Sequence, residues 1–190
     1  KLMKAISKSL KKNDPNHLNL GIRYGYIEQL DDELLRISKE SFDALSFNCY
    51  ALSPDHEKMN HALEISGLQM IIGEYHFGTV DRGLAQSLWQ VNSQKERGDA
   101  FRYYTENAFA HRGLIGTGWF RWIDQNINGR TDGENYNCGF IDVTDRPYPY
   151  MVDAAIEAAK SLYEIHSGTK TPFHQAPNAV GHSPIPDLWE

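Results

Sequence analysis

The chain has little cysteine, no long apolar run and no surplus of basic residues. Its two cysteines, Cys49 and Cys138, make neither a disulfide framework nor a cysteine-rich metal site. No run of 18 apolar residues occurs, so no membrane-spanning helix is expected. The 190 residues include 19 basic and 25 acidic ones without a basic stripe. The composition therefore predicts a globular protein that binds neither membrane nor nucleic acid.

Several catalytic and cofactor signatures are also missing. The sequence contains no GxGxxG or P-loop string, which a nucleotide-binding sheet would normally carry after a strand. It has no GxSxG elbow for a nucleophilic serine. Glu74 and His76 could be two metal ligands on one face, but no HxH or CxxC string accompanies them. We therefore expect no metal and no organic cofactor.

Helical and strand patterns alternate along the chain. Helices are predicted over residues 2–12, 31–41, 54–66, 94–111 and 150–165. Strands are predicted over residues 17–24, 44–50, 67–75 and 114–122. This alternation indicates a parallel sheet, either half of a (β/α)8 barrel or a small doubly wound sheet. The long segments 76–93 and 123–147 after two strands resemble the active-face loops of a barrel.

The third predicted strand ends in reactive side chains. An apolar run, residues 70–72, stops at Gly73 and is followed by Glu74, Tyr75 and His76. Barrel enzymes place their catalytic groups at the carboxyl ends of strands, so Glu74 is the first catalytic candidate. The two-residue period of a strand predicts four side chains on one face: Met70, Ile72, Glu74 and His76.

Three further side chains are candidate partners of Glu74. Arg23, Tyr50 and His76 follow or end predicted strands and could donate hydrogen bonds to a carboxylate. Such donors stabilise the ionised form that a nucleophile needs. Each residue also has a structural alternative: an ion pair between Arg23 and Glu74, core packing for Tyr50, and a packing histidine at His76.

The end of the fourth predicted strand is rich in aromatic residues. Trp119 could stack against the apolar face of a galactose-type sugar, with core packing as its alternative. Asp124 and Gln125 lie just beyond the strand, where sugar hydroxyls would be recognised. Glu134 lies in a turn-rich loop, where a turn role competes with substrate contact. These four residues complete the predicted substrate site.

Three strings resemble a known family: IIGEYHFGTVDRG, GTGWFRWIDQ and GRTDGENYNCGFIDVTDRPYP. They look like the C-terminal half of the agarase-type glycoside hydrolases of family 50, which are retaining enzymes with a (β/α)8 barrel. The resemblance covers residues 1–166 and implies an α/β fold, the C-terminal half (strands 5 to 8) of a TIM barrel. Residues 167–190 would be a surface tail. By resemblance, Glu74 is the nucleophile at the end of the seventh strand, Tyr50 ends the sixth, and Trp119 lies in the eighth.

The sequence departs from this family at the proton donor. In the larger clan of retaining enzymes to which that family belongs, the acid/base glutamate follows an asparagine at the end of the fourth strand. This chain has no such pair at a strand end. The resemblance therefore implies an N-terminal barrel segment that carries the acid/base, or self-association through open sheet edges. It implies a galactan or agarose oligosaccharide as substrate, and an extracellular or periplasmic location. A β-galactosidase-like enzyme and a non-catalytic sugar-binding fragment are the alternatives.

Overall fold

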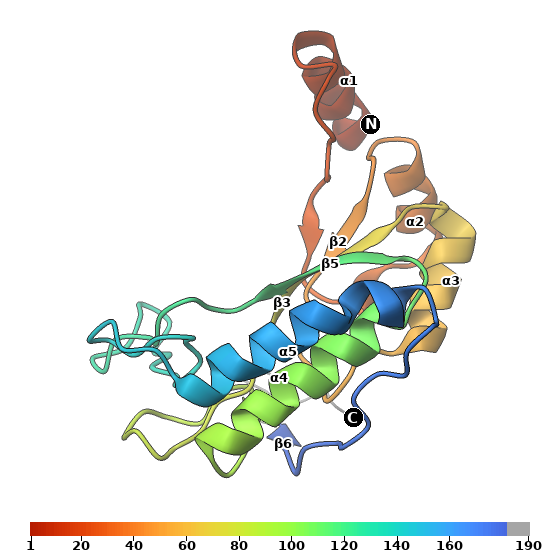
Figure 1. Ribbon diagram of the computed structural model, residues 1–190. Coiled ribbons are helices and arrows are strands. Elements are labelled where there is room, and N and C mark those ends of the chain that lie inside the picture. Colours follow the sequence, from red (N-terminus) through yellow and green to blue (C-terminus); the bar gives the residue numbers. More distant parts are fainter. Residues whose placement is uncertain (182–190) are drawn as a thin grey trace. The chain divides into compact units, whose positions relative to one another are not determined.

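The computed structural model describes residues 1–181, which fall into two compact units (Figure 1). The first unit comprises residues 1–49, 54–74 and 111–118, and the second comprises residues 50–53, 75–110 and the part of the chain from residue 119 onward. None of the helices in residues 1–181 is long and apolar enough to cross a membrane.

The first unit is built on a four-stranded sheet in the order β1-β2-β3-β5. Strands β1 and β2 pair in parallel, as do β2 and β3. The strands are β1 (Arg23–Tyr24), β2 (Leu45–Phe47), β3 (Met70–Tyr75) and β5 (Leu114–Trp119). The helices before and between them are α1 (Leu2–Asn13), η1 (Ile27–Gln29), α2 (Asp32–Lys39) and α3 (His56–Ser66). The predicted alternation and the parallel pairing of the first three strands are confirmed.

Local side chains set the limits of the helices in this unit. The Asp31 carboxylate caps α2 by accepting the Leu34 amide at 2.8 Å, and Asp55 caps α3 in the same way. An N-cap of this kind satisfies a backbone donor that has no partner within the helix. Helix α3 ends at Gly67, whose φ of 67° is the left-handed conformation that glycine adopts without strain.

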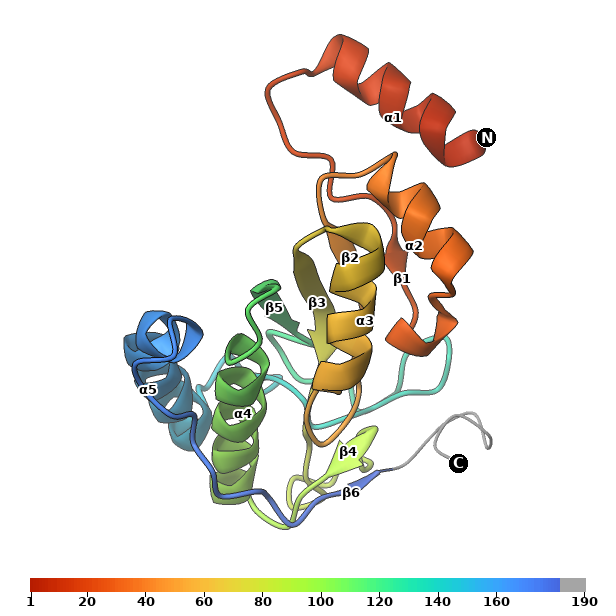
Figure 2. The same cartoon turned by 90° about the vertical axis from the view of Figure 1, so that its right-hand side faces the viewer.

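The core of the first unit lies between the sheet and the helices α2 and α3, which Figure 2 shows side by side. Its members are fully or almost fully buried apolar side chains: Leu35, Leu45, Phe47, Met59, Met70, Ile72 and Leu114. Burial of each large side chain contributes about 1.5–3 kcal/mol relative to leaving it exposed.

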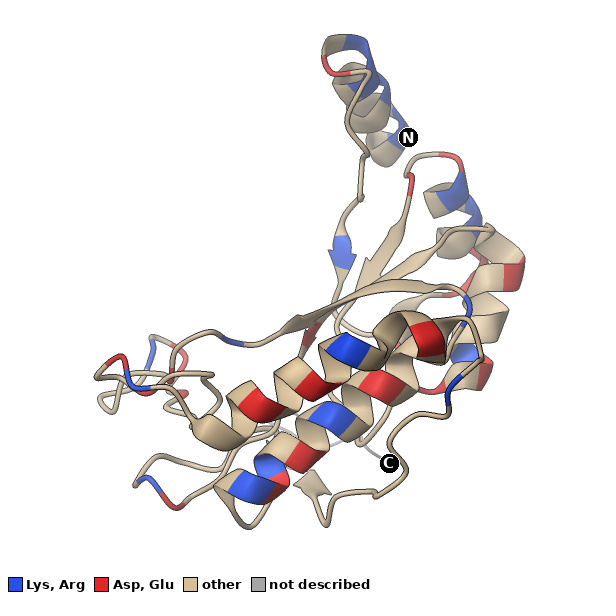
Figure 3. Cartoon of the chain, in the orientation of Figure 1, with Lys and Arg blue, Asp and Glu red and all other residues tan. Residues whose placement is uncertain are grey.

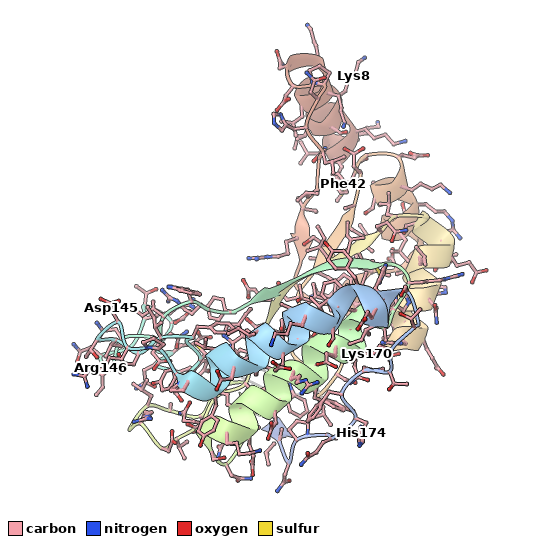
Figure 4. The ribbon with its side chains drawn as sticks, viewed as in Figure 1. Lys8, Phe42, Asp145, Arg146, Lys170 and His174 are labelled. Carbon is pink, nitrogen blue, oxygen red and sulfur yellow. The ribbon has the colours of Figure 1, made fainter. Side chains whose placement is uncertain are left out.

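The strand predicted over residues 17–24 is wrong for most of its length. Within this segment only β1 pairs with the sheet, and Leu18 is 72% exposed. Gly21 interrupts the segment with a φ of 74°, and a Cβ there would lie 2.6 Å from the Phe42 ring labelled in Figure 4. The backbone before Gly21 bonds instead to Asp43, which accepts the Asn19 amide at 2.7 Å.

The second unit contains two packed helices, α4 (Gln94–Phe109) and α5 (Pro149–His166). Ser93 caps α4 by accepting the Glu96 amide, and the Glu96 carboxylate accepts the Asn92 amide in return. A short antiparallel pair, β4 (Trp89–Gln90) with β6 (Val180–Gly181), was not predicted. It ties residues 180–181 of the tail to the loop after β3, and residues 182–190 of the predicted tail lie outside the described residues.

Helix α1 is amphipathic but buries none of its residues. Its apolar stripe is exposed and consists of Leu2, Ile6 and Leu10. Lysines cover another part of its surface (Figure 3), and Lys11 forms an ion pair with Asp43 at 2.7 Å. The bounds of α1 confirm the helix predicted over residues 2–12.

Candidate active site

Strand β3 contains a β-bulge at its carboxyl end. The Leu45 amide donates to the Gln69 carbonyl and the Cys49 amide donates to the Glu74 carbonyl, each at 2.9 Å. Between these two bonds the chain through β2 advances four residues, from 45 to 49, whereas the chain through β3 advances five, from 69 to 74. The extra residue breaks the two-residue alternation, as bulges do where a side chain is redirected.

Glu74 points to a different face of the sheet from the one that alternation predicted. Met70 and Ile72 are fully buried, and the Met70 side chain lies next to Leu63 of α3 beside Gly113. The Glu74 carboxylate instead contacts Asn48, which follows β2, and alternation places the Asn48 side chain on the opposite face of the sheet from the fully buried Leu45 and Phe47. The prediction that Glu74 shares a face with Met70 and Ile72 is therefore wrong, because the bulge shifts the alternation.

Two side chains hold the Glu74 carboxylate. The Arg23 guanidinium lies 2.8 Å from Oε1, and the Asn48 amide donates to Oε2 at 3.2 Å. The Glu74 side chain is 19% exposed and that of Arg23 is 51% exposed, so the carboxylate remains partly accessible. Gly73 makes room for this arrangement, since a Cβ there would lie 2.2 Å from the Arg23 side chain. The structure thus brings Glu74 and Arg23 together, as either interpretation of the sequence required.

Two residues near Glu74 were missed by the sequence analysis. Asn48 lies within the predicted strand 44–50, where alternation puts it on the same face as Ser46 and Tyr50, so the sequence contained a signal for it. Tyr26 lies between β1 and η1, and its pKa is raised by burial and by the negative charges of Glu74 and Glu28. No periodic pattern marks Tyr26, because it lies outside the regular elements.

His76, in the second unit, is buried and uses both ring nitrogens on the backbone. Nδ1 lies 3.0 Å from the Phe120 carbonyl and Nε2 accepts the Leu88 amide at 3.1 Å, which fixes a neutral ring with the proton on Nδ1. Burial is the main cause that lowers the pKa of His76 to about 3. These contacts favour the packing alternative for His76, and a substrate contact through its ring stays a prediction.

The buried His76 predicts a pH-dependent stability. The pKa of the His76 ring is 6.5 in the unfolded chain and about 3 in the folded protein. Between these pH values the unfolded state therefore binds more protons than the folded state. The free energy of unfolding should therefore fall as the pH drops from 6.5 toward 3, at about 1.4 kcal/mol for each pKa unit of difference. Urea unfolding of wild type and His76→Gln measures this, and the variant should show a flatter acid profile. Equal slopes for wild type and His76→Gln would contradict the assignment.

Tyr50 is buried beside His76. Their rings meet edge to face with centroids 4.9 Å apart, and Tyr136 contacts His76 in the same manner at 5.8 Å. The structure thus brings two predicted site residues, Tyr50 and His76, into direct contact. The predicted hydrogen bond from Tyr50 to Glu74 stays a prediction.

Trp119 is part of an aromatic cluster. Its indole N–H donates to the Cys138 carbonyl at 2.7 Å, and its ring contacts Tyr75, Phe101 and Phe140. Trp122, in contrast, is 68% exposed, and its ring stacks on Phe140 with the centroids 5.9 Å apart. These contacts favour core packing for Trp119, and its predicted sugar contact stays a prediction.

Asp124 and its neighbours form a buried polar network. The carboxylate accepts hydrogen bonds from the Asn137 side chain at 2.8 Å, the Gly139 amide at 2.7 Å and the Tyr148 hydroxyl at 2.6 Å. Burial and the bond to Asp124 raise the pKa of Tyr148, so the phenol stays protonated. The fully buried Arg97 donates to the carbonyls of Asn137 and Gly139. Asp124 therefore has a clear structural role, and its predicted role in substrate binding stays a prediction.

Gln125 and Glu134 are brought together. The Gln125 side chain donates to Glu134 Oε2 at 2.7 Å and accepts the Tyr136 amide at 2.6 Å. Glu134 also pairs with Arg130 at 3.2 Å. These bonds close the loop after β5, and substrate contact by Gln125 or Glu134 stays a prediction.

The described residues offer no evident metal centre and no reactive thiol. Residues 1–181 contain no group of three or more His, Cys, Asp or Glu side chains placed to hold a metal ion. Both cysteines are buried, and burial raises the pKa of Cys138 to about 12, which keeps that thiol protonated. The Glu74 carboxylate is a partly accessible group whose position is fixed by Arg23 and Asn48.

The Glu74 carboxylate thus lies at the carboxyl end of a strand that pairs in parallel with β2, next to an arginine and an asparagine. The chain is similar to the β-agarases. It is 36% identical over 165 residues to β-agarase A of Vibrio sp. (strain JT0107). The aligned region covers 83% of this chain and 16% of that protein. No protein-family model matches the chain.

Solved structures support the same relationship. The family 50 protein PfGH50B superposes with a TM-score of 0.82 at 35% identity, over 87% of this chain and 24% of that one. The agarase AgWH50C gives a TM-score of 0.81 at 36% identity, over 87% of this chain and 26% of that one. The chain is thus β-agarase-like in sequence and fold, and it spans about a sixth of the curated relative and about a quarter of these solved chains.

Proposed function

We propose that this chain is the C-terminal half of a (β/α)8 barrel, strands 5 to 8, in a retaining glycoside hydrolase that cleaves β-linked galactose-containing polysaccharide, with agarose as the substrate. Residues 1–166 would form the half-barrel and residues 167–190 its surface tail. Glu74 is the nucleophile. The observation that carries this proposal is the Glu74 carboxylate, held by Arg23 and Asn48 after a bulge, in a chain similar to β-agarases.

The proposed chemistry is the two-step reaction of retaining glycosidases. In the first step a Glu74 oxygen forms a bond to the anomeric carbon, while the bond from that carbon to the leaving oxygen breaks. The leaving oxygen takes a proton from a second carboxyl group, as in retaining glycosidases. In the second step water attacks the same carbon, gives its proton to the second carboxylate and releases Glu74. Arg23 and Asn48 stabilise the ionised nucleophile before attack and after release.

The second carboxyl group would come from outside this chain. We propose an N-terminal barrel segment as its source, with self-association of the chain as the alternative. The edge strands of the four-stranded sheet, β1 and β5, offer backbone groups for further pairing. The apolar stripe on α1 is exposed within residues 1–181 and could also contact such a segment. The polysaccharide substrate suits an extracellular or periplasmic location.

The stereochemistry of the product tests this proposal. The chain, combined with a barrel segment that supplies the acid/base, should release from an agaro-oligosaccharide a sugar that initially has the β configuration at the new anomeric centre. Proton NMR of the fresh reaction measures this. Initial release of the α anomer would contradict the retaining mechanism. Sugar binding without any turnover in the combined sample would favour the alternative of a non-catalytic binding fragment, whereas preference for simple β-galactosides would favour a β-galactosidase-like enzyme.

A further inference from the structure

The second unit contains a pocket that is separate from the residues around Glu74. Its volume is about 220 Å³, below the roughly 300–1,000 Å³ of drug-sized sites, so it suits one small ring. It lies between the loops after β3 and β5 and the start of α5. Six side chains that line it carry the argument: Arg82, Leu84, Ile127, Asp142, Val143 and Tyr148.

The floor of this pocket is held rigidly. The buried Tyr148 donates from its hydroxyl to Asp124 at 2.6 Å and accepts from Asn137 at 3.0 Å. The Arg97 guanidinium lies 4.3 Å from the centre of the Tyr148 ring. A ligand would therefore meet a surface that is already ordered, which reduces the entropic cost of binding.

The pocket presents one available cation and one available carboxylate oxygen. The Arg82 guanidinium lies 5.5 Å from the Tyr148 ring centre, and within residues 1–181 no carboxylate pairs with it. Asp142 Oδ1 is occupied by the Thr144 amide and hydroxyl, each at 2.7 Å, and by the Arg146 amide at 3.1 Å. Its other oxygen, Oδ2, accepts from no donor in the described part of the chain. Figure 4 marks this turn at Arg146.

The chemistry of the lining indicates a neutral polyhydroxyl ligand. A free guanidinium can donate to one hydroxyl oxygen while a free carboxylate oxygen accepts from another. Because Arg82 and Asp142 carry opposite charges, the attraction of one for an ionic ligand is offset by the repulsion of the other, so the pair favours no net charge. The apolar side chains of Leu84, Ile127 and Val143 can cover the C–H groups of a sugar ring, and the last two are exposed to solvent.

We infer that this pocket is a sugar-binding subsite that holds one neutral galactose-type ring of a polysaccharide. Its galactose character rests on the proposed function, whereas its preference for a neutral polyol rests on Arg82 and Asp142. The residues that recognise this ring are not those that hold Glu74. Substrate recognition therefore has a second anchoring point, which binds without taking part in the chemical step.

Methyl NMR of the chain titrated with neoagarotetraose tests the subsite. Leu84, Ile127 and Val143 carry methyl groups in the pocket wall, and their signals should shift on binding. The Arg82→Met variant keeps an unbranched side chain but loses the donors, so it should weaken these shifts and raise the Kd by about tenfold or more. The Arg36→Met variant is the matched control, because Arg36 is an exposed arginine of α2, and it should bind like the wild type.

Each outcome of this titration decides the inference. Shifts of the pocket methyl groups that weaken in Arg82→Met but not in Arg36→Met support it. Unchanged pocket methyl signals at millimolar neoagarotetraose overturn it, as do equal affinities for wild type and Arg82→Met. Tighter binding of a sulfated galactan oligosaccharide would overturn the preference for a neutral ligand. Failure of the subsite leaves the proposed hydrolase intact, since that proposal depends on turnover through Glu74 and not on these signals.

Discussion

Replacing Glu74 by glutamine is expected to abolish hydrolysis of agarose by the assembled barrel, lowering kcat on the order of 10⁴-fold or more. The glutamine amide keeps the size of the side chain but is not a nucleophile toward an anomeric carbon. A loss of this size corresponds to about 5.5 kcal/mol of transition-state stabilisation. Reducing-sugar release from an agaro-oligosaccharide, measured for wild type and variant at equal concentration, gives the result.

The matched control for this variant is Glu64→Gln. Glu64 is an exposed glutamate of α3 and has no place in the proposed site, so its replacement should leave kcat unchanged. Binding of neoagarotetraose should also survive Glu74→Gln, because the change removes a nucleophile and leaves most contacts in place. A Glu74→Gln enzyme with more than a tenth of wild-type turnover would be incompatible with a nucleophilic role.

Replacing Asp124 by alanine is expected to lower the free energy of unfolding by about 3–5 kcal/mol. The change leaves the donors of Asn137, Gly139 and Tyr148 without their acceptor inside the protein. It also removes a negative charge that favours the protonated form of the buried Arg97, whose pKa is lowered mainly by burial. Urea unfolding followed by tryptophan fluorescence measures the loss.

An exposed aspartate is the control for Asp124. Asp132→Ala removes a surface ion pair with Arg130 and should cost no more than about 1 kcal/mol. The double variant Arg97→Met with Asp124→Ala should lose less stability than the sum of the two single variants, because both changes act on one network. Additive losses, or a loss below about 1 kcal/mol for Asp124→Ala, would show that the network contributes little.

The sequence was sufficient to predict most helices and the parallel strands, because apolar periodicity and caps act locally. Asp55 and Gly67 mark the two ends of α3 in the sequence as they do in the structure. The strand over residues 17–24 failed because Gly21 breaks it and the preceding backbone bonds to Asp43, a residue distant in the chain. Periodicity alone contains no information on such a contact.

The candidate site was predictable in its central residue and less so in its surroundings. Glu74 and Arg23 were both named from strand ends, and the structure pairs them at 2.8 Å. The bulge that sets the direction of Glu74 could not be predicted, because a one-residue difference between β2 and β3 appears only in the hydrogen bonds. The burial of His76 and Asp124 likewise depends on loops whose course no local pattern determines.

Trapping of the glycosyl-enzyme tests the central claim most directly. A 2-deoxy-2-fluoro-galactoside with a good leaving group slows the release of the covalent intermediate, so the sugar stays attached to the nucleophile. Intact mass and peptide sequencing after incubation with the assembled barrel should locate one sugar on the Glu74 side chain. A sugar attached to a different carboxylate, or complete turnover of substrate without any adduct under conditions that trap a retaining galactosidase, would contradict the assignment of Glu74 as the nucleophile.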